Sequence, residues 1–225
     1  MAVRGIATSS AIEDYAKAIY GLELRAGGAV STNALAERLG VTAASASGMV
    51  KRLDELGLVS HVPYRGVELT ADGRRLALEV LRHHRLLELY LAESLGVPWD
   101  RVHEEAEVLE HVLSEELEEA ISAKLGNPTH DPHGDPIPTA DLRIEEGDTV
   151  PLQSLRAGQA GTLVRVSDAD PEMLRYLAER GIAPGSRFQI VDKHPFDGPL
   201  FARFGAEVHV LGGALAQAMR VEVQS

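Results

Sequence analysis

The stretch Val102-His-Glu-Glu-Ala-Glu-Val-Leu-Glu-His-Val-Leu-Ser114 combines a helical hydrophobic pattern with a high density of metal-binding side chains. At about 100° per residue, one side of the predicted helix over residues 102–114 carries His103, Glu107, Glu110 and His111. The opposite side is apolar and carries Ala106, Leu109, Val112 and Leu113. Two imidazoles and two carboxylates on one stripe indicate a divalent cation, because neutral imidazole is a good ligand and clustered carboxylates need a positive partner. The alternative is a solvated acidic helix face.

A second predicted helix offers the same ligand types. His84 and Glu88 are four residues apart in Arg82-His-His-Arg-Leu-Leu-Glu88, so they share a helix face. The chain has no cysteine, which leaves only nitrogen and oxygen ligands and disfavours a thiolate zinc site. Two such helices predict a divalent-metal site between them.

The composition favours a cytoplasmic protein with no membrane segment. The 225 residues are enough for two or three small domains, and cysteine and an apolar signal core are both absent. The net charge of −12 argues against general coating of nucleic acid, although eight glutamates lie between Glu104 and Glu119. Residues 31–75 do not share the excess of acidic residues, because they contain six Lys or Arg and five Asp or Glu.

A winged helix-turn-helix is predicted near the N-terminus. Apolar periodicity predicts a first helix over residues 12–24, with Asp14 near its start. Ser31 caps a short helix that ends before Gly40, and Thr42 caps a second helix that ends before Gly57. Residues 58–62 and 67–69 then read as a strand pair.

The second of these capped helices has the composition of a DNA-recognition helix. Its first turns are small, which allows close approach to base edges, while hydroxyls and basic side chains suit phosphates. The candidate DNA contacts are Thr42, Ala44, Ser45, Ser47, Gly48, Lys51, Arg52 and, at the tip of the wing, Arg65. For Arg65, a solvated turn arginine is an equal alternative.

The remainder of the chain contains a proline-rich loop followed by a region of short strands. The loop Asn127-Pro-Thr-His-Asp-Pro-His-Gly-Asp-Pro-Ile-Pro138 contains His130 and His133, for which a turn or surface role is favoured over metal ligation. From Thr149, short apolar runs separated by Gly and Pro predict a small antiparallel barrel with a helical insert over residues 171–180.

In this order, the elements resemble the diphtheria toxin repressor family of metal-dependent transcriptional repressors. The most specific segments are Glu13-Asp-Tyr-Ala-Lys-Ala-Ile-Tyr20, His84-Arg-Leu-Leu-Glu88, Val102–His111 and the proline loop. The resemblance implies an α+β chain with a winged helix-turn-helix domain (1–74), a helical dimerisation and metal-binding domain (75–140), a linker (141–150) and an SH3-like domain related to FeoA (151–225).

The resemblance also implies two metal ions per subunit. The primary site would use Asp14, Glu107, Glu110 and His111, and the ancillary site His84, Glu88 and His103. The SH3-like domain would add a ligand from among Asp168, Asp170 and Glu172, of which Asp168 and Glu172 are preferred. Carboxylates at Asp14 and Glu107, where the iron-sensing branch has methionine and cysteine, favour Mn(II), with Fe(II) as the alternative. Lys17 stands where the manganese branch has an acidic residue, which puts that branch's binuclear arrangement in doubt.

The expected function is a homodimeric repressor that binds a palindromic double-stranded DNA operator when metal is bound, and so controls genes of metal uptake and homeostasis. The family's base-reading glutamine falls at Gly48, which leaves the operator sequence open. Two alternatives from other classes are a metallohydrolase that uses the His/Glu cluster and a metal-independent winged-helix regulator.

Overall fold

The computed structural model describes residues 2–3, 6–7, 9–62, 64–145, 147–196 and 198–224. It divides into two compact units. The first contains Met1–His84, Glu110–Leu113 and Pro138–Arg143, and the second contains Arg85–Leu109, Ser114–Ile137 and Ile144–Ser225. Of the helices in the described part of the chain, none has the length and apolar character that a membrane crossing requires.

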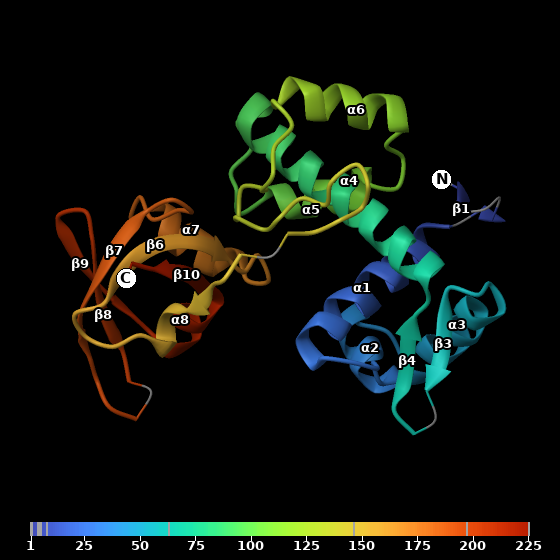
Figure 1. The fold of residues 1–225 in the computed structure, drawn as a ribbon, viewed down its shortest axis with the longest axis horizontal. Coiled ribbons are helices and arrows are strands. Elements are labelled where there is room, and N and C mark those ends of the chain that lie inside the picture. The colour runs from blue at the N-terminus through green and yellow to red at the C-terminus, as the bar shows by residue number, and fades with distance from the viewer. Residues whose placement is uncertain are drawn as a thin grey trace. The chain divides into compact units, whose positions relative to one another are not determined.

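The first unit is a helical bundle with a two-stranded hairpin (Figure 1). Its elements are β1 (Ala2–Val3), β2 (Ile6–Ala7), α1 (Ser10–Ala26), α2 (Thr32–Leu39), α3 (Ala43–Glu55), β3 (Val59–Val62), β4 (Gly66–Leu69) and the first part of α4 (Ala71–Leu95). Ser31 and Thr42 are the N-caps of α2 and α3, and each side chain accepts a hydrogen bond from the backbone three residues on. The predicted helix-turn-helix and wing are therefore present.

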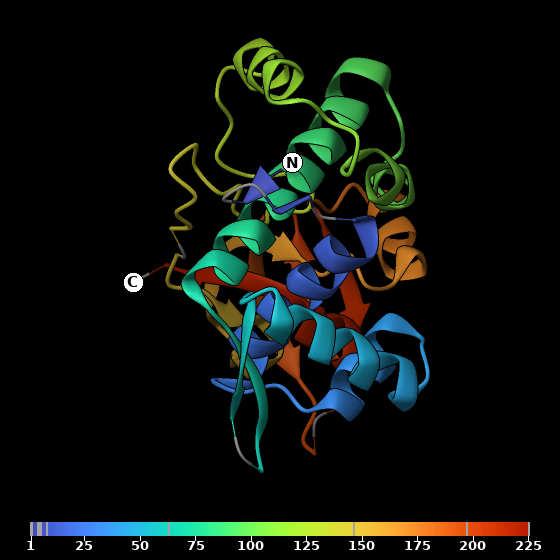
Figure 2. The ribbon, with the colours of Figure 1, turned by 90° about the vertical axis from the view of Figure 1, so that its right-hand side faces the viewer.

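A buried carboxylate fixes the hairpin to the helices of the first unit. Glu23 of α1 accepts hydrogen bonds from the Leu69 backbone at 2.6 Å and from the Arg74 guanidinium at 2.8 Å. Gly66 has φ +120° and lies so close to the Val30 carbonyl that a Cβ atom would overlap it. With its base held in this way, the hairpin extends beyond α1, α2 and α3 as a wing (Figure 2).

The predicted helix over residues 102–114 is wrong in its last part. The structure has α5 (Val102–Leu109), a turn, and then α6 (Glu115–Lys124). Glu110 and His111 lie in the turn, where the Glu110 carbonyl pairs with the Nδ1 atom of His83 at 3.1 Å. A continuing helix would need that carbonyl for its own ladder, whereas Ser114 caps a new helix through the Leu117 amide.

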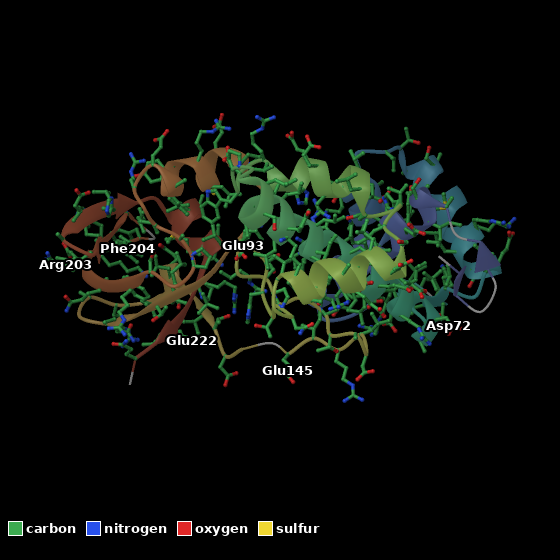
Figure 3. All side chains as sticks on the ribbon, turned by 90° about the horizontal axis from the view of Figure 1, so that it is seen from above. Asp72, Glu93, Glu145, Arg203, Phe204 and Glu222 are labelled. Carbon is green, nitrogen blue, oxygen red and sulfur yellow. The ribbon has the colours of Figure 1, made fainter. Side chains whose placement is uncertain are left out.

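The C-terminal part of the second unit is an antiparallel sheet, as the predicted barrel requires. Its strands are β5 (Val150–Pro151), β6 (Ala160–Val166), β7 (Arg187–Lys193), β8 (Leu200–Phe204), β9 (Glu207–Leu211) and β10 (Met219–Val223), in the order β5-β10-β6-β7-β8-β9. The short helices are η1 (Leu152–Ser154), α7 (Pro171–Ala178) and α8 (Gly213–Ala218). Residues alternate between core and solvent, as Phe204 and Arg203 of β8 do (Figure 3).

The proline loop attaches this sheet to the helical part of the second unit. Its Asp131 carboxylate accepts the backbone amides of His133 and Asp135 at 2.9 Å each, and Asp135 contacts Arg165 of β6 at 3.1 Å. Trp99, in the α4–α5 connection, packs against the sheet core and stacks on the His133 ring. His133 is only 1% exposed, so the surface role considered for it is wrong, although it does lie in a turn.

Candidate metal centre

A first ligand cluster lies in the first unit. We call Asp14, Glu110 and His111 the first cluster. Asp14 comes from α1, and the other two come from the turn after α5. One ligand atom of each lies within 4.8 Å of the others. Residues almost 100 positions apart in the sequence thus supply one imidazole and two carboxylates to one small volume.

Glu110 is the most deeply buried member of the first cluster. Its side chain is 0% exposed, and each of its oxygens contacts a nitrogen. Oε1 lies 2.5 Å from the Lys17 ammonium, and Oε2 contacts His84 Nδ1. A buried carboxylate is costly unless it is paired, so these contacts hold the charge of Glu110 in place.

The ring nitrogens of His111 lie close to three carboxylates, those of Glu13, Asp14 and Glu110. Its Nδ1 lies 2.6 Å from Glu13 Oε2, and its Nε2 lies 3.0 Å from Asp14 Oδ1 and 3.6 Å from Glu110 Oε1. A neutral imidazole that donates Nδ1–H to Glu13 presents the Nε2 lone pair toward Asp14 and Glu110. That is the ring orientation that a metal-ligating histidine needs, with Glu13 fixing the tautomer.

A second ligand cluster lies in the second unit. We call Glu88 of α4, His103 of α5 and Asp168 of the β6–α7 connection the second cluster. His103 Nδ1 lies 3.2 Å from Glu88 Oε1 and 3.2 Å from Asp168 Oδ2. The hydrogen bonds to Asp168 and Glu88 raise the pKa of His103 to about 10.

The pKa of Asp168 moves in the opposite direction. Burial alone would raise the pKa of this carboxyl, but the hydrogen bond from His103 and the charge of that ring hold it below its usual value. The ion pair between a protonated imidazole and a carboxylate is thus what the second cluster contains without a metal. An incoming cation would have to replace the imidazole proton, which makes binding at this cluster depend on pH.

Two residues beside the second cluster were not singled out as ligands from the sequence. Asp131 and His133 each place a ligand atom within 4.8 Å of Glu88, and all three are buried. His133 Nε2 lies 2.8 Å from the Trp99 carbonyl, to which it donates, while its buried Nδ1 has no hydrogen-bond partner and lies 3.9 Å from Glu88 Oε2. A buried lone pair facing carboxylates fits a metal ligand. In the sequence, the Asp-Pro-His spacing is the only local feature that points to Asp131 and His133 as ligands. The burial of these two residues depends on contacts with distant segments.

The remaining candidate ligands stand as follows. Glu107 of α5 lies 3.6 Å from the Nε2 atom of His103. His84 precedes Glu88 by one turn of α4 and pairs with Glu110 within the first unit. Glu172 is exposed in the first turn of α7, where its backbone amide bonds to Asp170.

All the candidate DNA contacts are exposed to solvent. These residues are Thr42, Ala44, Ser45, Ser47, Gly48, Lys51, Arg52 and Arg65. All but Thr42 and Arg65 lie on α3, for which Thr42 is the N-cap. The core side of the same helix carries Ala46, Val50 and Leu53. The second helix of the helix-turn-helix therefore presents a small, hydroxyl-rich and basic face to solvent.

The donors of both clusters fit a divalent first-row metal. They are carboxylate oxygens and imidazole nitrogens, gathered at hydrogen-bond and ion-pair distances. Such a set suits Mn(II) and Fe(II) and lacks the thiolates that select zinc or copper(I).

Family comparisons cover most of the chain. Residues 7–67 match the iron dependent repressor N-terminal DNA-binding domain, residues 70–139 the iron dependent repressor metal-binding and dimerisation domain, and residues 150–223 the FeoA domain. The iron-dependent repressor IdeR of Mycobacterium tuberculosis is 34% identical and covers 93% of this chain and 96% of its own length. The diphtheria toxin repressor of Corynebacterium diphtheriae is 31% identical with the same coverage.

Solved structures give the same result. A manganese-dependent transcriptional repressor in complex with manganese is 45% identical, with a TM-score of 0.87 over 93% of this chain and 98% of that one. The manganese regulator SloR is 31% identical, with a TM-score of 0.76 over 95% and 98%. These proteins are repressors and regulators rather than enzymes, which sets the metallohydrolase hypothesis aside. The chain therefore belongs to the iron-dependent repressor, or diphtheria toxin repressor, family of metal-dependent transcriptional repressors.

Proposed function

We propose that this repressor is a Mn(II)-activated homodimer that binds a palindromic operator in the cytoplasm and controls genes of metal uptake and homeostasis. The observation that carries the proposal is the first cluster. Asp14 lies in the segment that matches the family's DNA-binding domain, whereas Glu110 and His111 lie in the segment that matches its metal-binding and dimerisation domain. We assign the domains to residues 1–74, 75–140 and 151–225, with a linker over residues 141–150.

Two ions per subunit are proposed. The primary ion takes Asp14, Glu110, His111 and, from α5, Glu107. The ancillary ion takes His84, Glu88, His103 and Asp168, and Glu172 is the weaker candidate because it is exposed. The buried Nδ1 atom of His133 and the carboxylate of Asp131 offer this second ion further donors on the side of Glu88.

Mn(II) is proposed as the effector because the primary ligands include hard carboxylate oxygens and no sulfur. The manganese-dependent repressors among the structural relatives support this choice. Fe(II) is the alternative, and it is favoured by those sequence relatives that are named iron-dependent repressors. Both metals imply the same switch and differ in the genes that it serves.

The switch is a change in the freedom of the DNA-binding segment. A bound ion would be held by ligands from both α1 and the α5–α6 turn. The free energy by which it shifts the conformational equilibrium equals the difference between its binding free energies to the DNA-competent arrangement and to the others. On α1, Asp14 places its carboxylate beside Nε2 of His111, and the neighbouring residue Glu13 contacts Nδ1 of the same ring. The residues of α1 therefore both present a ligand and align one from the turn.

A second copy of the chain is the proposed partner of the helical domain. Four apolar side chains in the segment 108–117 are exposed, with Val108 at 71% and Val112 at 77%. The other two are Leu109 and Leu117. Apolar exposure of this kind marks an interaction surface. In such a dimer the two copies of α3 would reach successive major-groove faces, about one helical turn or a multiple apart.

The test is binding to DNA from the chain's own promoter region, titrated without oxygen with Mn(II) and separately with Fe(II). The wild type is compared with the double variant Asp14→Met, Glu107→Cys. We expect Mn(II) to activate the wild type at the lower free concentration and the double variant to shift toward Fe(II). DNA binding by the wild type that is as tight in excess chelator as with metal would contradict the metal switch and would favour the metal-independent regulator.

A further inference from the structure

Tyr64 lies at the tip of the wing, where the chain turns from β3 to β4. Its exposed fraction is 107%, so the whole ring is presented to solvent. Tyrosine combines an apolar ring with a hydroxyl, which suits it to a surface that is partly apolar and partly hydrated. The wing tip therefore offers an aromatic ring and a hydroxyl to a partner outside the chain.

The base of the wing is fixed, which gives its tip a defined position beside α3. Glu23 of α1 accepts hydrogen bonds from the Leu69 amide and the Arg74 guanidinium, as described above. Val30 exchanges two backbone hydrogen bonds with Val67 of β4, at 2.8 and 2.9 Å. On its other side, β3 contacts α3, the helix that carries most of the candidate DNA contacts. The wing and α3 thus form one continuous part of the first unit.

The charge of the wing suits a polyanionic partner. The chain as a whole has a net charge of −12, yet residues 58–67 contain no Asp or Glu. Both His61 and Arg65 belong to this stretch and are exposed. An exposed ring that adjoins a guanidinium, with no carboxylate in the same stretch, can approach the phosphates of DNA without repulsion from its own strands.

The composition of α3 leaves part of the DNA contact to other elements. Ala44 and Gly48 lie on its exposed face and have no hydrogen-bonding group in their side chains. The space around Gly48 is open, because a Cβ atom there would meet no atom within 4 Å. With few groups on α3 that can read a base, contacts with the sugar-phosphate backbone supply a larger share of the affinity.

We propose that Tyr64 is a DNA contact of the wing tip and lies in the minor groove beside the major groove that α3 enters. Its ring packs on a deoxyribose, and its hydroxyl donates a hydrogen bond to a phosphate. The minor groove is about 6 Å wide, so it admits a side chain of the tip but not the two-stranded hairpin. This inference rests on the proposed operator binding and adds an uncharged contact to it.

The test is the salt dependence of DNA binding by the full-length protein. Anisotropy with a labelled fragment of the chain's own promoter region is measured at saturating Mn(II), from about 50 to about 200 mM salt. We expect Tyr64→Ala to bind about tenfold more weakly with an unchanged slope of log affinity against log salt, because an uncharged side chain releases no counterion. Tyr64→Phe keeps the ring and should lie between Tyr64→Ala and the wild type. Arg65→Ala should instead reduce the slope by about two for the two copies in the proposed dimer.

Phe196→Ala is the matched control. Phe196 is also an exposed aromatic residue in a hairpin connection, with an exposed fraction of 101% and φ +59° against +61° for Tyr64. It lies in the segment that matches the FeoA domain, so its removal should leave DNA affinity within about twofold. Because Tyr64 is exposed, Tyr64→Ala should keep the melting temperature of the wild type, which separates a lost contact from a lost fold.

A cross-link identifies the partner of the wing tip directly. The chain has no cysteine, so Tyr64→Cys provides a single attachment point for a photoactivatable cross-linker. Irradiation with promoter DNA and Mn(II) should give a protein–DNA adduct that is absent in chelator. An adduct between two copies of the chain, or none at all, would overturn the inference.

The affinities separate failure of this inference from failure of the proposed function. If the wild type binds the promoter fragment and Tyr64→Ala binds it equally well, only the inference is overturned. The same holds if Tyr64→Ala reduces the salt slope as Arg65→Ala does, because Tyr64 then only holds the wing in place. If the wild type does not bind this DNA with metal present, the proposed function fails and the inference falls with it.

Discussion

The two ligand clusters hold their carboxylates without a metal in different ways. In the first cluster, Glu110 is fully buried and pairs with the fixed charge of Lys17. In the second cluster, Glu88 and Asp168 pair with His103, whose pKa they raise to about 10 and whose side chain is 36% exposed. The cation of the first cluster is a lysine ammonium, whereas that of the second is an imidazolium that would have to give up its proton to bind a metal.

This difference separates two ways of tuning a metal sensor. A lysine ammonium ordinarily keeps its charge near neutral pH, so it does not by itself make metal affinity depend on pH there. A titratable imidazole instead makes affinity depend on pH, because metal and proton compete for the same nitrogen. We therefore expect the first cluster to respond to metal concentration and the second to respond to metal concentration and pH together.

The largest effect is expected from Glu110→Ala. This change removes the carboxylate at the centre of the first cluster and leaves Lys17 and His84 facing one another. We expect loss of one ion per subunit and a fall in metal-activated DNA affinity of about 100-fold, near the upper end of common coupling energies. Fluorescence anisotropy with labelled operator DNA measures the fall.

Glu104→Ala is the matched control, because Glu104 is an exposed glutamate of α5. It makes the same change in charge and should leave DNA affinity within about twofold. Equal losses in both variants would show that net charge, not the first cluster, controls DNA binding.

A smaller effect is expected from Asp168→Ala. This change removes the ligand that the β6–α7 connection adds to the second cluster. We expect loss or weakening of the second ion with a fall of about tenfold in DNA affinity, while the affinity of the primary ion is retained. Asp170→Ala, two residues on, should bind the second ion as the wild type does. If it behaves like Asp168→Ala, the assignment within residues 168–172 must be revised.

The pH dependence of stability in chelator should distinguish the clusters. The folded-state pKa of His103 is raised from 6.5 to about 10, chiefly by the hydrogen bonds to Asp168 and Glu88. The stabilisation that this pairing gives is complete below pH 6.5 and disappears as the pH rises to about 10. Melting temperatures of the wild type and His103→Gln should therefore differ most at low pH and converge at high pH.

Proton release measures the same property with the metal present. Mn(II) binding at the second cluster should release a proton from His103, and calorimetry in buffers of different ionisation enthalpy detects it. His103→Gln should abolish this release. Unchanged release in the variant would mean that another group in the protein carries the proton.

The smallest effect is expected from Glu107→Gln in the Asp168→Ala background, where the primary ion can be followed with the second ion weakened. The primary ion should bind about fivefold more weakly, because an amide oxygen can still coordinate a cation. The carboxylate of Glu107 also lies 3.6 Å from His103. If the primary ion is unaffected and the second ion weakens in Glu107→Gln alone, Glu107 belongs to the second cluster.

Local signals predicted most of the fold. Ser31 and Thr42 are caps whose hydrogen bonds lie three residues on, so the helix-turn-helix could be located from the sequence. The end of α5 could not be located from the sequence. The turn at Glu110 is held by His83, 27 residues earlier, and by Lys17, 93 residues earlier, and no periodicity within residues 102–114 contains these partners.

The same distinction applies to the candidate sites. Helical spacing made His84 and Glu88 candidate ligands, and the resemblance to the family added Asp14 and, as one of three candidates within residues 168–172, Asp168. Asp131 and His133 were not chosen as ligands because a loop rich in proline and aspartate normally lies at the surface. Here it is buried by Trp99 and by β6, where the Val166 amide bonds to the His133 carbonyl at 2.9 Å.

Trp99 gives this repressor an optical signal of its own. It is the only tryptophan in the chain, and its indole stacks on His133 with 5.7 Å between ring centroids while packing against the sheet core. The emission of a single, partly buried indole reports the polarity around one ring. A blue-shifted spectrum that persists while the operator is bound or released therefore means that the α4–α5 connection and the sheet stay packed together, and a red shift means that they have separated. The protein needs no attached dye for this measurement.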